Sequence, residues 1–197
     1  PALKALFARV AGEGSDQDKI IRVTTFLQRH MFHPRWPPLD TAGVLVFDPT
    51  WLLETRLGQC GQTNRLLTDI LSAGGYRTRV VQLFGHVAAE VRYGGKWHFL
   101  DADALSAGTF VMNRSGEIAS TMEIVNDPSL LDGIEAYDFT RSYPVEVQHE
   151  ALSLREAFSR RKYTEDGLLT PFAYVKTAKP EQEHDEYYGW THYDTVP

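Results

Sequence analysis

The sequence contains a single cysteine among 197 residues, so an internal disulfide is excluded. Its apolar runs all fall short of the roughly 18 residues that a membrane-spanning helix needs. Its first residues show no signal-peptide pattern, and we expect a soluble protein. The net charge is −6 and there is no basic run, which argues against nucleic acid or an anionic membrane as a partner. Internal repeats and a phosphate-binding loop are also missing from the sequence.

The length and composition of the sequence are typical of one globular domain. A hydrophobic content of 43% in a chain of this length is enough for one sizeable core, so we predict a single domain over residues 1–197. Its core is expected at about 16–125, followed by a C-terminal extension at about 150–197. The extension is acidic and too rich in aromatic residues for a simple disordered tail. We expect it to pack over the core; stacking on a sugar or peptide is the alternative.

The only cysteine, Cys60, lies at the start of a predicted helix. Small and polar residues precede it, and apolar residues then recur at helical spacing at Leu66, Leu67, Ile70 and Leu71. Gly74-Gly75 ends the pattern. Cys60 would therefore lie in the first turn of a buried helix, where unpaired N–H groups and the helix dipole favour a thiolate. The alternative is a buried, inert cysteine.

Two strands joined by a tight turn follow a β-rich run at 76–84. Gly94-Gly95 is the turn signal, and it separates residues 86–93 from residues 96–103. A two-residue turn pairs Tyr93 with Lys96 and brings the beginning of one strand opposite the end of the other. His86 then falls opposite Asp103, with Asp101 as its diagonal neighbour.

A nucleophilic thiol, a base and a carboxylate therefore occur in the chain order cysteine, histidine, aspartate. Cysteine needs a base to become thiolate, and the base needs a carboxylate to fix its tautomer. Hairpin geometry by itself leaves Asp101 and Asp103 both open as the carboxylate.

From Asp16 to Asp103 the sequence resembles the transglutaminase-like superfamily of papain-type cysteine enzymes. The resemblance is carried by Gly58-Gln59-Cys60, by the helix that ends in Gly-Gly-Tyr-Arg-Thr-Arg-Val, by the histidine opening a strand, and by Gly95-x-Trp97-x-x-Leu100-Asp101. It implies an α+β fold with a papain-like core, in which the helix bearing the cysteine packs on an antiparallel sheet. It also implies Cys60 as nucleophile, His86 as general base and Asp101 as the acid that orients the base.

Two departures from the family pattern concern the substrate cleft. Gly61 follows the cysteine where the family often has an aromatic residue, and Ala102 follows Asp101 where the family often has proline. Neither removes a member of the triad, but both leave the cleft unassigned.

The resemblance implies an enzyme that cleaves or transfers an acyl group at an amide bond through a thioester. Its substrate would be a peptide, a protein or another molecule bearing an amide. We favour hydrolysis, because amine transfer needs a second binding groove and protection from water. The backbone N–H of Cys60 would contribute to the oxyanion hole, with the Gln59 side chain or the Trp36 indole as a second donor. The alternative is a non-catalytic binding or scaffold module, although such modules usually lose a triad residue.

We predict no metal and no cofactor. His30 and His33 are three residues apart, but cationic residues at a helix end explain them better. His184, Asp185 and His192 could also bind a metal, and a solvated tail explains them equally well. The oligomeric state is left open by the sequence.

Four further elements are expected from local patterns. They are a helix from Asp16, capped by Ser15 and ending near His33-Pro34; a short helix at Trp51–Leu57; a second hairpin formed by Thr109–Met112 and Glu117–Thr121; and a short helix at Leu152–Arg161.

Overall fold

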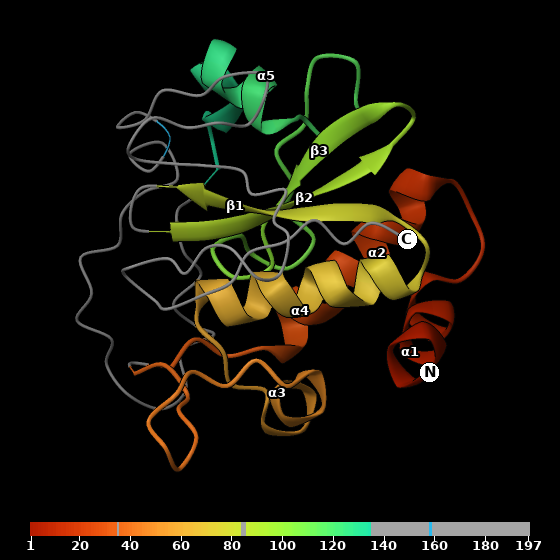
Figure 1. Cartoon of the computed structure of the whole chain (residues 1–197). Helices are drawn as coiled ribbons and strands as arrows, with labels where there is room; N and C mark the ends of the chain where they lie inside the picture. The colour runs from red at the N-terminus through yellow and green to blue at the C-terminus, as the bar shows by residue number, and fades with distance from the viewer. Residues whose placement is uncertain (35, 84–85, 135–157, 159–197) are drawn as a thin grey trace.

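The computed structural model describes residues 1–34, 36–83, 86–134 and 158, and these residues form an α+β fold (Figure 1). A three-stranded antiparallel sheet of order β1-β2-β3 consists of β1 (Arg77–Leu83), β2 (His86–Tyr93) and β3 (Lys96–Leu100). Helix α4 (Cys60–Ala73) lies along one face of this sheet, where it contacts β1 and β2. The predicted fold class, a cysteine-bearing helix packed on an antiparallel sheet, is confirmed.

The hairpin register agrees with the one expected from the sequence. Tyr93 pairs with Lys96 across the Gly94-Gly95 turn, and the ladder continues to Ala89 opposite Leu100. Both turn glycines have positive φ, 57° and 81°, which explains why glycine is needed there.

Three more helices surround α4. Helix α2 (Asp16–His30) begins at a capping box in which Ser15 and Asp18 bond each other's backbone, and it ends where Met31 becomes extended. Helix α3 (Pro49–Thr55) is capped by Asp48, close to the predicted short helix. Helix α1 (Ala2–Ala11) was not predicted, although its apolar residues recur at helical spacing.

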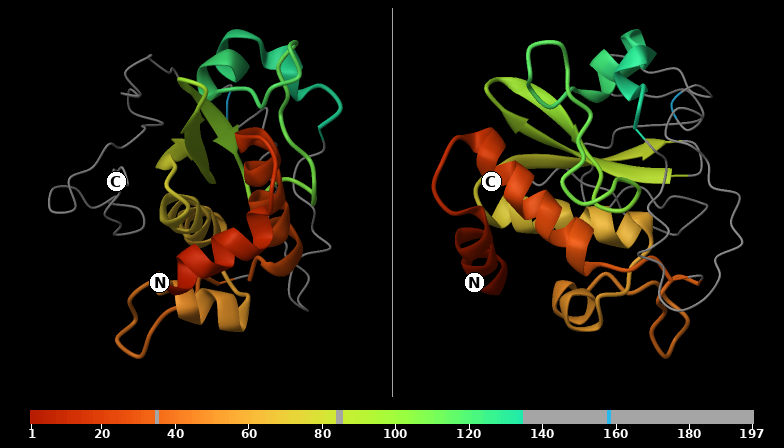
Figure 2. Two further views of the ribbon diagram at one scale, coloured as in Figure 1. Left: turned by 90° about the vertical axis from the view of Figure 1, so that its right-hand side faces the viewer. Right: turned by 180° about the vertical axis from the view of Figure 1, so that it is seen from behind.

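Helix α1 packs on the same core as α2 and α4. Its Phe7 ring lies against the end of α4, and a Cβ added to Gly74 would come within 2.6 Å of that ring. The glycine that the sequence identifies as a helix stop is therefore also required by packing. Figure 2 shows α1 and α2 next to α4 on one side of the sheet.

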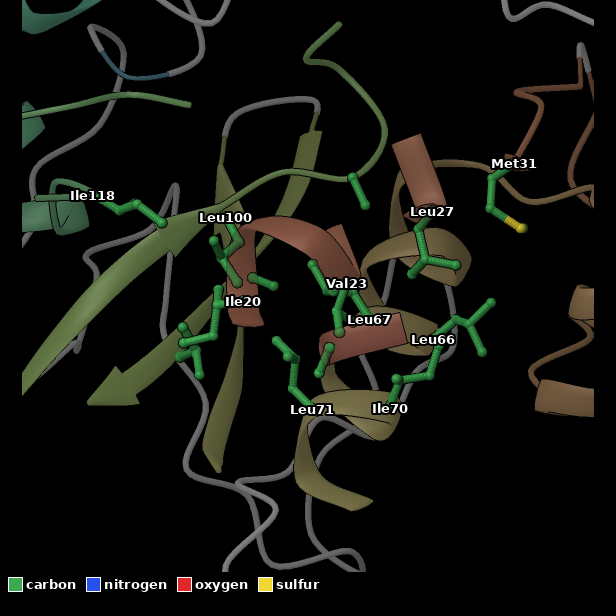
Figure 3. Packing of buried hydrophobic residues seen from close by; sticks show 14 of the residues in the cluster. Ile20, Val23, Leu27, Met31, Leu66, Leu67, Ile70, Leu71, Leu100 and Ile118 are labelled. Carbon is green, nitrogen blue, oxygen red and sulfur yellow. The ribbon is translucent and has the colours of Figure 1, made fainter. Parts of the chain in front are cut away.

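Each face of the sheet carries its own apolar cluster. Figure 3 shows the larger one, in which Ile20, Val23 and Leu27 of α2 meet Leu67 and Leu71 of α4. Consecutive residues of the same strand, such as Ala88 and Ala89 of β2, belong to opposite clusters, as the strand period of two requires. The second face is covered by α5 (Thr121–Asn126) and the 3-10 helix η1 (Pro128–Leu131).

The predicted second hairpin is reduced to a single bridge. Met112 pairs with Ile118, and the Asn113 N–H donates to the Glu117 carbonyl at 2.8 Å. Regular strands do not form because Ser120 caps α5 and so ends the extended segment.

The C-terminal predictions fall largely outside the described residues. This holds for the helix at Leu152–Arg161, apart from Phe158, and for the possible metal ligands of the tail. Phe158 is buried and packs edge-on against Phe99, with 5.4 Å between the ring centroids. The domain limits remain a prediction. Among the described helices, none combines the length and apolarity that crossing a bilayer requires.

Candidate active site

Helix α4 places Cys60 at its first residue, 5% exposed, against Val80 and Val87 of the sheet. The turn before it is tight, because the Thr63 hydroxyl donates to the Gly58 carbonyl at 3.0 Å. A Cβ on Gly58 would lie only 3.0 Å from that same hydroxyl oxygen. Gly58, two residues before the cysteine, therefore lets the chain pass close to the start of the helix. The first backbone N–H groups of a helix have no acceptor within the helix.

His86 opens β2 beside this cysteine and is held by Asp101. Its Nε2 lies 2.6 Å from the Asp101 carboxylate, and both side chains are buried. One ring nitrogen of the imidazole lies within 4.8 Å of the Cys60 Sγ. Because Nε2 is engaged by Asp101, Nδ1 is the ring nitrogen that is left for the thiol. The three side chains thus stand in the order thiol, imidazole, carboxylate.

The two ionisable partners shift each other's pKa in opposite directions. Burial by itself lowers the pKa of His86, but Asp101 and the Cys60 side chain outweigh it and hold that pKa well above its usual range. For Asp101, burial raises the pKa, and His86 together with the backbone N–H groups of Asp103 and Ala104 brings it below the ordinary value. Both effects favour an imidazolium bonded to a carboxylate.

Asp101 is fixed by more than the histidine. Its second oxygen, Oδ1, accepts the backbone N–H groups of Asp103 and Ala104, each at 2.9 Å, and the Asn64 side chain at 3.3 Å. Its carbonyl accepts the Gln28 side chain at 3.0 Å. A buried carboxylate with this many donors stays charged and keeps one orientation.

Asn64 and Gln28 are positioning residues that the sequence analysis missed. Asn64 lies on α4, donates to the Val87 carbonyl at 2.8 Å and accepts the Ala102 N–H at 2.9 Å. Gln28 lies on α2 and accepts the Gly108 N–H at 2.8 Å. Both are fully buried polar residues on helices that face the core. A polar residue on the apolar face of an amphipathic helix is the signal that could have revealed them.

We expect Asn64→Ala to destabilise the fold by about 1–3 kcal/mol, because it leaves the buried Ala102 N–H without its acceptor. The measurement is chemical denaturation of the wild type and the variant. Asn126→Ala, the same change at the exposed last residue of α5, is the control and should cost less. An Asn64→Ala variant as stable as the wild type would contradict this role.

The structure separates the two aspartates that the hairpin left open. Asp101 meets Nε2 of His86, whereas the Asp103 carboxylate is bonded to His33, whose Nδ1 lies 3.0 Å from both of its oxygens. Asp103 also lies near the thiol: one of its oxygens, the Cys60 Sγ and a ring nitrogen of His86 are all within 4.8 Å of one another. His30 takes a different partner from His33, with its Nδ1 2.7 Å from the Phe26 carbonyl.

A loop between α2 and α3 borders the cysteine and is tied to the start of α4. Gln62 donates to the carbonyls of Val46, at 2.8 Å, and Pro38, at 3.2 Å. The Gln59 side chain, predicted as an oxyanion donor, donates to the Pro34 carbonyl at 3.3 Å. Trp36, the other donor considered, is 73% exposed. These contacts fix the loop beside Cys60.

The cysteine at the start of a helix, the sheet packed on that helix, and the histidine–aspartate pair on the hairpin reproduce the arrangement that the resemblance implies. The fold is transglutaminase-like.

Comparisons with known proteins are sparse. No family model and no curated protein matches the chain. Among solved structures, it is similar to a candidate protease from Parabacteroides distasonis ATCC 8503, with 18% identity and a TM-score of 0.44 over 50% of this chain. A candidate cysteine protease from Cytophaga hutchinsonii is 17% identical, with a TM-score of 0.41 over 51% of this chain. A structure described as a TGase is 19% identical, also with a TM-score of 0.41 over 51% of this chain.

The chain covers 22%, 36% and 31% of these three proteins, so it spans only a fifth to just over a third of their length. What its site can do follows from the geometry of Cys60, His86 and Asp101.

Proposed function

We propose that this transglutaminase-like chain is a cysteine enzyme that attacks an amide carbonyl and forms a thioester on Cys60. The observation that carries the proposal is the buried contact between His86 and Asp101, 2.6 Å long, with the Cys60 Sγ within 4.8 Å of a ring nitrogen of the same imidazole. A histidine whose pKa is raised stays protonated at neutral pH and favours the neighbouring thiolate. The start of α4 adds the positive end of a helix dipole.

In the first half-reaction, the Cys60 thiolate attacks the amide carbon and the carbonyl oxygen becomes an oxyanion. The backbone N–H of Cys60 is proposed as one donor to that oxyanion, because the first N–H groups of a helix have no intrahelical acceptor. Gln59 remains the proposed second donor. The intermediate collapses when His86 gives its proton to the leaving amine, which departs and leaves the thioester.

In the second half-reaction, neutral His86 takes a proton from water, and the resulting hydroxide attacks the thioester carbon. Collapse expels the Cys60 thiolate, restores the imidazolium and releases a carboxylic acid. We propose water as the acceptor rather than an amine, because water needs no second binding groove. Asp101 stays ionised throughout and holds the imidazole in place, as its lowered pKa favours.

Alkylation of the thiol tests the proposed activation. At pH 6 an unperturbed thiol is only about 0.3% thiolate, so its reaction with iodoacetamide is slow. We expect Cys60 in the folded chain to react at least about tenfold faster than the same cysteine in the urea-unfolded chain, as followed by mass spectrometry. The reason is that His86 and the helix start favour the thiolate.

The matched control is His86→Ala, which should bring the folded chain close to the unfolded rate. A panel of peptide amides, incubated with and without a primary amine, then separates the acceptors, since hydrolysis gives a carboxylic acid and transfer gives a new amide. Slow alkylation in the folded wild type would favour the non-catalytic scaffold. An amide as the main product would overturn the choice of water.

A further inference from the structure

The site contains a second buried carboxylate that the proposed acyl chemistry does not use. The Asp103 side chain is 1% exposed, and one of its oxygens lies within 4.8 Å of the Cys60 Sγ and of a His86 ring nitrogen. Asp101 already supplies the carboxylate that orients the histidine, from the other side of the ring. A further anion beside the thiol opposes the thiolate that acyl transfer needs. His33 holds Asp103 in this position, and the proposed acyl chemistry gives the carboxylate no role there.

The donor atoms of these three residues match a zinc ligand set. Thiolate, imidazole and carboxylate are the three groups that bind Zn²⁺ in proteins, at about 2.0–2.3 Å from the metal. Tetrahedral donors then lie about 3.3–3.8 Å apart, so donors within 4.8 Å of one another close around an ion with side-chain shifts of about 1 Å. Three protein ligands leave a fourth position for water, as in zinc sites with an open coordination position.

The surrounding hydrogen bonds are those that orient metal ligands. A ligating histidine almost always bonds a carboxylate through its other nitrogen, and Asp101 holds Nε2 of His86 in this way, which leaves Nδ1 toward the thiol. A ligating carboxylate is itself hydrogen-bonded, and His33 bonds both oxygens of Asp103 at 3.0 Å. The site thus has three donors and an orienting partner for two of them.

We propose that Cys60 Sγ, His86 Nδ1 and the Asp103 carboxylate bind Zn²⁺ and that the bound ion reversibly blocks the enzyme. Because the resting pair is a thiolate and an imidazolium, binding releases the Nδ1 proton of His86 to solvent and forms bonds from sulfur and from Nδ1 to zinc. The blocking effect rests on the proposed function, because the ion occupies the nucleophile and the base together. The binding itself does not depend on that function.

Protection of the cysteine tests the binding without any assay of turnover. Wild-type protein is treated with iodoacetamide in buffered Zn²⁺ and, separately, with excess EDTA, and modification of Cys60 is followed by mass spectrometry. We expect Zn²⁺ to slow the modification at least about tenfold and EDTA to restore the rate. Co²⁺ in place of Zn²⁺ should give the charge-transfer absorption of a cobalt–thiolate bond in the wild type and not in Cys60→Ser.

Asp103→Asn shows whether the second carboxylate is a ligand. We expect it to raise the concentration of Zn²⁺ that gives half-maximal protection by at least about tenfold. Asp127→Asn, at a carboxylate paired with Arg114 on the surface, is the matched control and should leave that concentration unchanged. Thermal melts in EDTA show that both variants are folded; if Asp103→Asn does not fold, the cobalt spectrum of the wild type decides.

Equal protection in Asp103→Asn and the wild type, or no protection in either, overturns the zinc site. A wild-type cobalt spectrum without the thiolate band overturns it as well. These results leave the acyl chemistry untouched, since turnover in EDTA is measured separately. Conversely, if the protein hydrolyses no amide but binds Zn²⁺ through Cys60, the zinc site is supported and the proposed function is rejected.

Discussion

Replacing Cys60 by serine is expected to abolish acyl transfer, by about 10⁴-fold or more in kcat/KM, while the fold survives. The two side chains differ by one atom, so serine should fit the small apolar cluster that Cys60 forms with Val80 and Val87. A serine hydroxyl is far harder to deprotonate than a thiol, and an imidazole paired with a thiolate is poorly matched to it. The measurement is hydrolysis of a panel of peptide amides in EDTA, beside a thermal melt.

The companion variant Cys60→Ala should be equally inactive, since it lacks any nucleophile. Both variants should melt close to the wild type, which separates loss of the nucleophile from loss of the fold. A serine variant with full activity and a normal melt would mean that Cys60 is only a core residue. The scaffold hypothesis would then replace the enzyme.

The second large effect is expected at Asp101. Asp101→Asn should lower kcat/KM by about 10²–10⁴-fold, the range that positioned acid–base groups contribute. The amide cannot stabilise the imidazolium as a carboxylate does, and it can fix the wrong tautomer of His86. Asp103→Asn is the matched control: the same chemical change two residues later, at a carboxylate bonded to His33 rather than to Nε2 of His86. Asp103→Asn should lower kcat/KM much less.

The pH dependence of the melting temperature gives a second test of the charged state of Asp101. Its pKa is lowered in the folded chain, so its stabilising contribution is present above the unfolded pKa and is lost as the pH falls through the folded value. The Asn variant should lose that acid-dependent contribution. If instead Asp103→Asn inactivates and Asp101→Asn does not, Asp103 is the functional acid and the family placement is wrong.

Local patterns in the sequence were sufficient for most elements near the site. Apolar spacing and the terminal Gly74-Gly75 predicted α4, and the Gly94-Gly95 turn predicted the hairpin and its register. Such features depend on neighbours in the chain, so periodicity and turn chemistry are enough to find them. The second hairpin was predicted too long, because the Ser120 cap of α5 ends the extended segment within the predicted strand.

The choice between the two aspartates illustrates what the sequence leaves open. Strand pairing placed both near His86, and only the resemblance to the transglutaminase-like superfamily favoured Asp101. In the structure, the chain leaves the strand after Leu100, and the backbone N–H groups of the next turn close around Asp101. A turn of this kind has no periodicity by which its side chains can be assigned in advance.

The sequence by itself therefore determined most elements near the site, the hairpin register and the order of thiol, imidazole and carboxylate along the chain. Tertiary structure alone decided which nitrogen of His86 meets which partner, the buried bonds of Gln28 and Asn64, and the approach of Asp103 to the thiol. The physical reason is the distance along the chain between the residues that interact. Helix spacing and turns are set by residues a few positions apart, whereas Gln28 reaches the Asp101 carbonyl and His33 reaches Asp103 only after α2 packs beside the sheet.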